Sequence, residues 1–143
     1  MKIAIVSGYF NPLHGGHLDM IEQAAKLGDK LIVIVNNDVQ QILKKGKIIL
    51  SQDNRMRLMR ALRDVDEVVL SIDQDLTQVK TLDLMADTYP NDELIFANGG
   101  DRDSEKVIPE TDVCNQRHIE MVFGLGEKVD SSTRINQALG HAQ

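Results

Sequence analysis

The sequence predicts an α/β fold, a doubly wound parallel sheet of five strands with helices on both faces. Short apolar runs rich in Val and Ile alternate along the chain with segments whose apolar residues recur at helical spacing. This alternation is typical of parallel strands joined by crossover helices. The chain has 143 residues, enough to bury one core, so we expect a single Rossmann-like domain over residues 1–143.

Five segments are predicted as strands because they are short, apolar and β-branched. They are Lys2–Ser7, Lys30–Asn36, Glu67–Ser71, Glu93–Ala97 and Ile119–Phe123. Right-handed crossovers would place the loops that follow the early strands along one edge of the sheet, where folds of this class bind ligands.

Helices are predicted where apolar residues recur every three to four positions beside a capping residue. Their apolar stripes lie within residues 18–27, 56–62, 79–86 and 135–139, and a further short helix starts at Pro109-Glu110. We expect Gly28 to end the first helix and Ser51 to cap the second.

Composition excludes several classes of protein. No apolar run approaches the roughly 20 residues that span a bilayer, and the N-terminus does not resemble a secretory signal. The net charge of −6, with two tyrosines, three phenylalanines and no tryptophan, disfavours a nucleic-acid-binding surface. Cys114 is the one cysteine and cannot form an internal disulfide, which agrees with a reducing compartment. We therefore expect a cytoplasmic protein without a membrane or nucleic-acid partner.

The segment GYFNPLHGGH, from Gly8 to His17, lies between the first predicted strand and the first predicted helix. Unpaired backbone N–H groups at a helix N-terminus bind phosphate. The spacing of His14 and His17 puts both imidazoles on one side of the first helical turn, where fixed donors could stabilise the charge that builds up on a nucleotide α-phosphate under attack. A lone histidine would more often be a capping or surface residue, but the pair with Gly16 favours phosphate chemistry. A zinc site is less favoured because no third ligand has matching spacing.

The same segment resembles the H-x-G-H signature of the nucleotidyltransferase superfamily. Further residues resemble, in order and spacing, its small cytidylyltransferase-like group, which includes glycerol-3-phosphate cytidylyltransferases: Leu27-Gly28-Asp29, Asp38, Arg55 and Val65 to Val69. The sugar-phosphate adenylyltransferases share much of this pattern. Such enzymes join a nucleoside triphosphate to a phosphorylated alcohol or sugar and release pyrophosphate, using Mg²⁺, and are commonly homodimers. The resemblance implies the same reaction, cofactor and assembly here.

The resemblance also implies roles for individual residues. His14 and His17 would contact the triphosphate and stabilise the transition state at the α-phosphorus. Residues of the same loop would lie beside the nucleotide, namely Tyr9, Phe10, Asn11 and Gly16.

Three further segments are candidate site residues. Ser131, Ser132 and Thr133 follow Asp130 at the start of the last predicted helix and resemble a second superfamily signature; hydroxyl and N–H groups there suit the β- and γ-phosphates. Standing alone, this cluster would be an ordinary helix cap.

In the resembling enzymes, a basic stretch like the predicted loop residues 44–47 reaches the triphosphate and the acceptor phosphate. This implies catalysis by Lys44 and substrate binding by Lys47, although lysine clusters are more often only solvated.

Arg55 could make a bidentate phosphate contact, with a surface position on its helix as the alternative. The segment Asn98-Gly99-Gly100-Asp101-Arg102 follows the fourth predicted strand, and family members carry a Gly-Asp loop here. The resemblance implies that Asp101 and Arg102 contact the substrate.

Two features leave the substrates open. Asn11 stands where the small cytidylyltransferases usually have Asp, and residues 124–129, around Gly126, lack the arginine that the glycerol-phosphate enzymes carry. CTP is weakly favoured as the nucleotide, and the alternative is ATP acting on a sugar phosphate or nicotinamide mononucleotide. A hypothesis of another class is a non-catalytic module that binds nucleotide for regulation.

Overall fold

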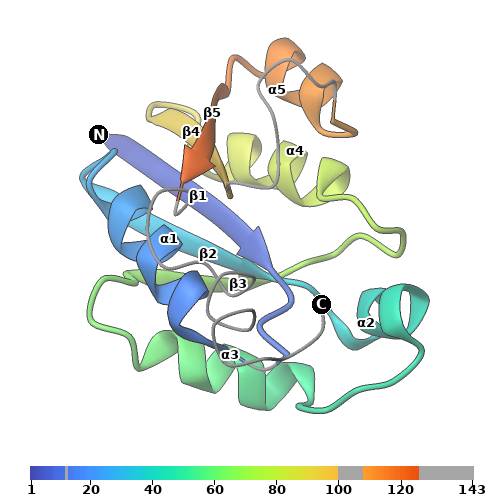
Figure 1. Cartoon of the computed structure of the whole chain (residues 1–143). Helices are drawn as coiled ribbons and strands as arrows, with labels where there is room; N and C mark the ends of the chain where they lie inside the picture. The colour runs from blue at the N-terminus through green and yellow to red at the C-terminus, as the bar shows by residue number, and fades with distance from the viewer. Residues whose placement is uncertain (12, 100–107, 126–143) are drawn as a thin grey trace.

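The predicted parallel sheet is present in the computed structural model, which describes residues 1–11, 13–99 and 108–125 (Figure 1). Its strands are β1 (Lys2–Gly8), β2 (Lys30–Val35), β3 (Glu67–Leu70), β4 (Glu93–Gly99) and β5 (Glu120–Leu125). They pair in parallel in the order β3-β2-β1-β4-β5. All five predicted strands are confirmed. The strand order reverses between β1 and β4, the place where open sheets of this kind bind ligands.

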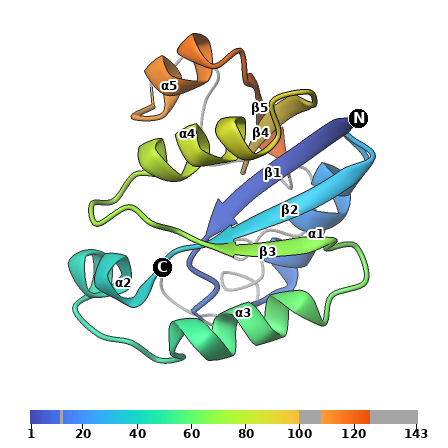
Figure 2. The same ribbon diagram turned by 180° about the vertical axis from the view of Figure 1, so that it is seen from behind.

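Helices cover both faces of this sheet (Figures 1 and 2). They are α1 (Gly15–Ala25), α2 (Asp38–Lys45), α3 (Gln52–Arg60), α4 (Val79–Thr88) and α5 (Thr111–Gln116). Helices α1 and α3 lie on one face, and α4 and α5 lie on the other. The α/β architecture that the sequence predicts is therefore confirmed.

Each face of the sheet has its own buried core because successive strand side chains point to opposite faces. In β1, Ile3 and Ile5 pack on the side of α4 and α5, whereas Ala4 and Val6 pack on the side of α1 and α3. Cys114 is completely buried in the first of these cores, and burial raises the pKa of its thiol to about 12. It is the inert core thiol that a single cysteine predicts.

Helix α2 is absent from the sequence prediction, which treats the region after β2 as a loop. Asn37 caps the helix by accepting the Gln40 N–H at 2.9 Å, and the Gln40 side chain accepts the Asn37 N–H at 3.0 Å. Gly46, with φ 77°, ends it in the left-handed conformation that glycine adopts most easily. The apolar residues of α2 are exposed, namely Val39, Ile42 and Leu43. These residues recur at helical spacing, so the sequence carries a signal for this helix that the prediction does not use.

Gly28 does not end the first helix as expected. Helix α1 stops at Ala25, and Lys26 forms its C-cap in the right-handed conformation. A Cβ atom on Gly28 would lie 2.7 Å from the backbone oxygen of Lys2. Glycine is therefore needed at this position for the close approach of the turn to β1, rather than for a left-handed cap.

Two other expectations concern the last predicted helix and the absence of a membrane-spanning segment. The helix predicted after Asp130 lies outside the described residues. In the part of the chain that the structure describes, no helix is long and apolar enough to cross a membrane.

Candidate active site

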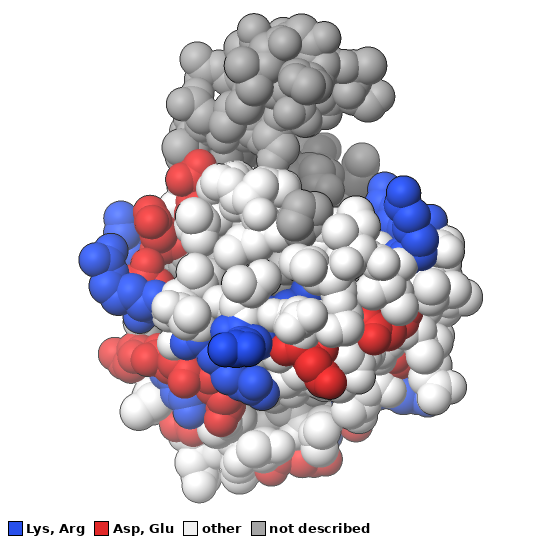
Figure 3. Space-filling model, turned by 90° about the horizontal axis from the view of Figure 1, so that it is seen from below, with Lys and Arg blue, Asp and Glu red and all other residues white. Residues whose placement is uncertain are grey.

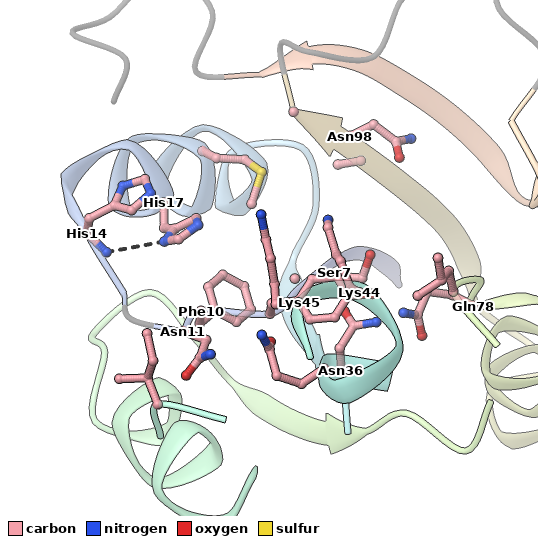
Figure 4. A pocket seen from close by; sticks show the side chains of 18 of the residues that line it. Ser7, Phe10, Asn11, His14, His17, Asn36, Lys44, Lys45, Gln78 and Asn98 are labelled. Carbon is pink, nitrogen blue, oxygen red and sulfur yellow. Dashed lines mark hydrogen bonds between the residues drawn. The ribbon is translucent and has the colours of Figure 1, made fainter. Parts of the chain in front are cut away.

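A pocket of about 610 Å³ lies at the carboxyl ends of β1, β2 and β4, beside the point where the strand order reverses. Each of these strands contributes residues directly: Ser7 and Gly8 from β1, Asn36 after β2, and Ala97 to Gly99 from β4. The opposite wall comes from α2 and from the segments around residues 76–78 and 110 (Figure 4). Five predicted site residues line the pocket from the loop after β1 and the start of α1: Tyr9, Phe10, Asn11, His14 and His17.

The loop after β1 is held in an unusual conformation. Phe10 has φ 51°, a left-handed backbone that costs a non-glycine residue of order 1 kcal/mol. Its ring is 1% exposed and meets the His17 ring edge-on, with 5.0 Å between the ring centroids. The Asn11 Oδ1 atom accepts the Leu50 N–H at 2.7 Å. The buried Phe10 ring therefore packs against the His17 ring and restricts its position.

Gly8 makes room for the Phe10 ring, because a Cβ atom at Gly8 would lie 2.6 Å from its Cζ atom. We expect Gly8→Ala to lower the free energy of unfolding by about 1 to 3 kcal/mol, the usual cost of overpacking, measured by urea denaturation. Gly15→Ala is the matched control because its Cβ would meet nothing within 4 Å. Equal stability of the two variants would contradict this account of Gly8.

His14 and His17 cap helix α1 together. The His14 Nδ1 atom accepts the Gly16 N–H at 3.2 Å, and the His17 Nδ1 atom accepts the His14 N–H at 3.2 Å (Figure 4). The two rings stack with 3.7 Å between their centroids and 23° between their planes. A neutral imidazole whose Nδ1 accepts carries its proton on Nε2. In this arrangement both histidines cap the helix and both line the pocket.

Both imidazoles are neutral at pH 7. Burial, and then the charge of His14, lowers the pKa of His17 to about 4. Burial also lowers the pKa of His14. Neutral donors can hydrogen-bond to phosphate oxygens in both the ground state and the transition state, and their interaction strengthens as negative charge develops.

The basic residues at the pocket come from the end of α2. Lys44 and Lys45 form its last turn, where the helix dipole favours positive charge, and Lys47 follows Gly46. All three line the pocket, and Lys44 Nζ lies 4.4 Å from the centroid of the Tyr9 ring. Lys44 and Lys47 therefore lie at the pocket, Lys44 on a helix rather than in the predicted loop, and their catalytic and substrate-binding roles stay predictions.

These lysines are a local basic group in an acidic protein. Figure 3 shows the molecule from the side on which α2 and α3 lie, and there basic and acidic side chains are interspersed with uncharged surface. A compact group of this kind suits a small phosphorylated ligand better than a long phosphate backbone.

The phosphate contact predicted for Arg55 is contradicted by its position. Arg55 is 0% exposed, because its helix turns it beneath the pocket. Nη1 donates to the carbonyl oxygens of Tyr9 at 2.8 Å and Asn36 at 2.6 Å. Nε donates to the Leu50 carbonyl at 2.9 Å, and Nη2 forms an ion pair with Asp38 at 2.9 Å. Arg55 therefore fixes the two backbone segments that follow β1 and β2.

Sequence reasoning missed several residues that line the pocket, among them Lys45, Gln41 and Gln78. The capping pattern of α2 could have indicated the first two, because it places residues 41, 44 and 45 on one side of a helix. Gln78 has no comparable sequence signal, since only the folded chain brings the segment before α4 to the ends of β1 and β4. Asp101, Arg102, Ser131, Ser132 and Thr133 lie outside the described residues.

The described residues form no metal site of their own. Among them, no three His, Cys, Asp or Glu side chains are grouped so that they could hold a metal ion. Within residues 1–11, 13–99 and 108–125, the histidine pair therefore has no third side chain with which it could bind zinc. Mg²⁺ is commonly bound through substrate phosphates and only one or two carboxylates, so the described residues do not test the expectation of Mg²⁺.

Comparisons with known proteins show what the chain is similar to. The family described as cytidylyltransferase-like matches residues 5–140. FAD synthase of Ferroglobus placidus is 38% identical over 76 residues, which cover 53% of this chain and 49% of that protein. Bifunctional protein HldE of Citrobacter koseri is 35% identical over 113 residues, with 70% of this chain and 24% of that protein covered. The chain thus spans about half the length of the first relative and about a quarter of the second.

A solved structure shares the fold. The lipopolysaccharide core biosynthesis protein from Thermoplasma volcanium is 23% identical, with a TM-score of 0.64, and the match covers 86% of this chain and 95% of that one. At this identity the similarity concerns the architecture alone.

Proposed function

The chain belongs to the cytidylyltransferase-like family, and on that premise we propose that it is a nucleotidyltransferase. It transfers a nucleoside monophosphate from a nucleoside triphosphate to a phosphorylated alcohol or sugar and releases pyrophosphate. CTP is the first donor to test. ATP, with a sugar phosphate or nicotinamide mononucleotide as acceptor, is the alternative.

The stacked pair of neutral histidines carries this proposal. Both imidazoles are oriented by backbone hydrogen bonds to Nδ1, so each proton is held on Nε2. Both rings line a pocket at the reversal point of the sheet, at the N-terminus of α1. Oriented donors beside a helix N-terminus suit a phosphate whose negative charge increases during reaction.

The reaction follows from these groups. An oxygen of the acceptor phosphate forms a bond to the α-phosphorus of the triphosphate. The bond from that phosphorus to the bridging oxygen breaks, and pyrophosphate leaves with the electron pair. His14 and His17 donate to the non-bridging oxygens of the α-phosphate, while Lys44, Lys45 and Lys47 supply positive charge to the phosphates. The acceptor phosphate is already a nucleophile, so no side chain needs to remove a proton.

Residues outside the described part of the chain complete the proposal. We assign Ser131, Ser132 and Thr133 to the β- and γ-phosphates, and Asp101 and Arg102 to the substrates. Mg²⁺ would enter with the triphosphate and neutralise part of its charge. Chelation by EDTA tests that requirement, and no step above depends on it.

A pyrophosphate-release screen tests the function. Each nucleoside triphosphate is paired with glycerol 3-phosphate, several sugar phosphates, nicotinamide mononucleotide and flavin mononucleotide. Release with one pair, and the matching nucleotide product by mass spectrometry, is the expected result. Triphosphate binding by calorimetry without release from any pair would refute the enzyme and favour the regulatory module.

A further inference from the structure

Helix α2, which carries two of the pocket lysines, is attached to the molecule by polar side chains. Of its eight residues, the two buried ones are Gln40 and Gln41, and its apolar residues Val39, Ile42 and Leu43 are exposed. A helix in a globular protein usually takes most of its stability from an apolar face packed on the core. Because α2 buries no such face, its position depends on hydrogen bonds.

The side-chain amide of Gln40 makes four of these hydrogen bonds and is 0% exposed. Its Oε1 atom accepts from the Asn36 Nδ2 atom and from the Asn37 N–H, both at 3.0 Å. Its Nε2 atom donates to the carbonyl oxygens of Asp75 at 2.8 Å and Thr77 at 3.0 Å. A glutamine amide offers two donor hydrogens and two acceptor positions, so Gln40 uses all of them.

The two ends of this amide join different parts of the chain. Oε1 bonds within the end of β2 and the start of α2, whereas Nε2 crosses to the segment between β3 and α4, which is 35 to 37 residues further along the chain. That segment also lines the pocket, through Leu76 and Gln78. The Nε2 bonds of Gln40 therefore connect two parts of the pocket wall.

Helix α2 has a second attachment on another side, to α3. The Asp38 N–H donates to the Gln52 Oε1 atom, and the Gln52 N–H donates to the Asp38 Oδ1 atom, both at 2.9 Å. The same Asp38 oxygen forms the ion pair with Arg55. A single attachment at Asp38 would let the helix rotate about its first residue. The bonds of Gln40 to the segment after β3 supply the second attachment that fixes the direction of the helix.

The direction of α2 determines where its lysines lie. Lys44 and Lys45 are in its last turn, about 6 to 7.5 Å along the axis from Gln40. Figure 4 shows their side chains extending from α2 into the space between His17 and Asn98. A small rotation of the helix at Gln40 would displace the ammonium groups, and in an aligned site a misplacement of about 1 Å can cost a large factor in rate.

We propose that Gln40 is a positioning residue of this pocket: its amide joins the start of α2 to the segment after β3 and so holds Lys44 and Lys45 at the phosphates of a bound triphosphate. This inference rests on the proposed function and adds the residue that sets the position of the lysines.

Calorimetric binding of CTP and of ATP to variants of Gln40 tests the proposal. Gln40→Met keeps the length of the side chain and removes the amide, while Asn37 can still cap α2 through the Gln40 N–H. We expect the Kd of the tighter-binding triphosphate to rise about tenfold, the scale of one lost charge-assisted hydrogen bond. Gln74→Leu is the matched control, because Gln74 is exposed in the same segment and does not line the pocket. Its Kd should stay within about twofold of the wild-type value.

A second variant guards against loss of the helix itself. Gln40→Glu keeps an oxygen that accepts the Asn37 N–H, as in the usual capping box, and an ionised carboxylate cannot donate to the Asp75 and Thr77 carbonyls. Circular dichroism and urea denaturation show whether each variant is folded. The triphosphate Kd of Gln40→Glu should also rise about tenfold or more, since the negative charge adds to the loss of the donor.

A double-mutant cycle separates positioning of the lysines from a general loss of structure. The second change is Lys44→Gln together with Lys45→Gln, which removes both charges from the last turn of α2. If Gln40 acts through these lysines, Gln40→Met should weaken triphosphate binding about tenfold in the wild-type background and less than about twofold in the neutralised background. A general loss of structure would give the same factor in both.

The outcomes separate this inference from the proposed function. Equal factors in the two backgrounds, or triphosphate binding by Gln40→Met and Gln40→Glu equal to that of Gln74→Leu, would overturn the inference and leave wild-type turnover standing. Triphosphate binding without pyrophosphate release would refute the enzyme, and the cycle would still decide the role of Gln40. A wild-type protein that binds neither CTP nor ATP would overturn both.

Discussion

Replacing His17 with alanine is expected to lower kcat by at least about a hundredfold, the usual scale for losing one transition-state donor. The Nε2–H group of His17 is fixed by the bond from the His14 N–H to Nδ1, so its alignment costs nothing during the reaction. Its loss should raise KM for the triphosphate less, because the lysines and the helix N-terminus remain. Steady-state kinetics with the pair found in the screen measures both constants.

Two further variants make this result specific. His17→Asn keeps an oxygen acceptor for the His14 N–H and removes the imidazole donor, so it should lose kcat while retaining the helix cap. His118→Asn is the matched control: His118 is exposed and has φ 57°, a conformation that asparagine tolerates. Near-normal kcat in His17→Ala would remove His17 from its assigned role.

The protonation of His17 gives an expected pH dependence. Its pKa in the folded protein is about 4, below the ordinary value of 6.5, so the neutral form is the main one throughout pH 5 to 8. We therefore expect the pH profile of kcat/KM, which reports groups of the free enzyme, to show no loss from His17 near pH 6.5. A loss of activity with a midpoint near 6.5 that disappears in His17→Asn would contradict the burial of this imidazole.

Replacing Arg55 with leucine is expected to lower the free energy of unfolding by about 3 kcal/mol, because the buried guanidinium makes four hydrogen bonds, one of them to the partly exposed Asp38 carboxylate, and each contributes about 1 kcal/mol. The change leaves the carbonyl oxygens of Tyr9, Asn36 and Leu50 and the Asp38 carboxylate without this donor. Buried acceptors that lose their partner carry the full cost of desolvation. Urea denaturation measures the difference.

The control for Arg55 lies on the same helix. Arg57 is exposed on α3, so Arg57→Leu should change stability by only about 0.5 kcal/mol or less. Arg55→Lys should also be destabilising, because an ammonium group cannot reach the acceptors that the planar guanidinium joins. If Arg55→Leu were as stable as Arg57→Leu, the buried arginine would not be holding the loops beneath the pocket.

The fold could be predicted because its signals are local. Buried parallel strands require unbroken apolar runs, and β1 and β2 show them. Ser51 caps α3 as the sequence predicts, with Ser51 Oγ accepting the Asn54 N–H at 3.3 Å. Helix α2 was not predicted although Val39, Ile42 and Leu43 recur at helical spacing, because a helix of eight residues offers only one short apolar stripe.

The site was predictable where its groups are close together in sequence. His14 and His17 are three residues apart, and helical geometry alone places them on one side of a turn. The prediction for Arg55 was wrong because the sequence gives the charge of this side chain but not the direction in which it points. Its burial depends on Tyr9 and Asn36, which are far from it in the chain and meet it only after β1 and β2 have paired.

The sequence by itself determined the parallel α/β architecture, the histidine pair and the presence of lysines after the second strand. The tertiary structure alone decided that Arg55 lies beneath the pocket and that Gln41 and Gln78 line it. The reason is physical: periodicity and capping act within a few residues of chain, whereas burial and the pairing of polar atoms depend on which distant segments the folded sheet brings into contact.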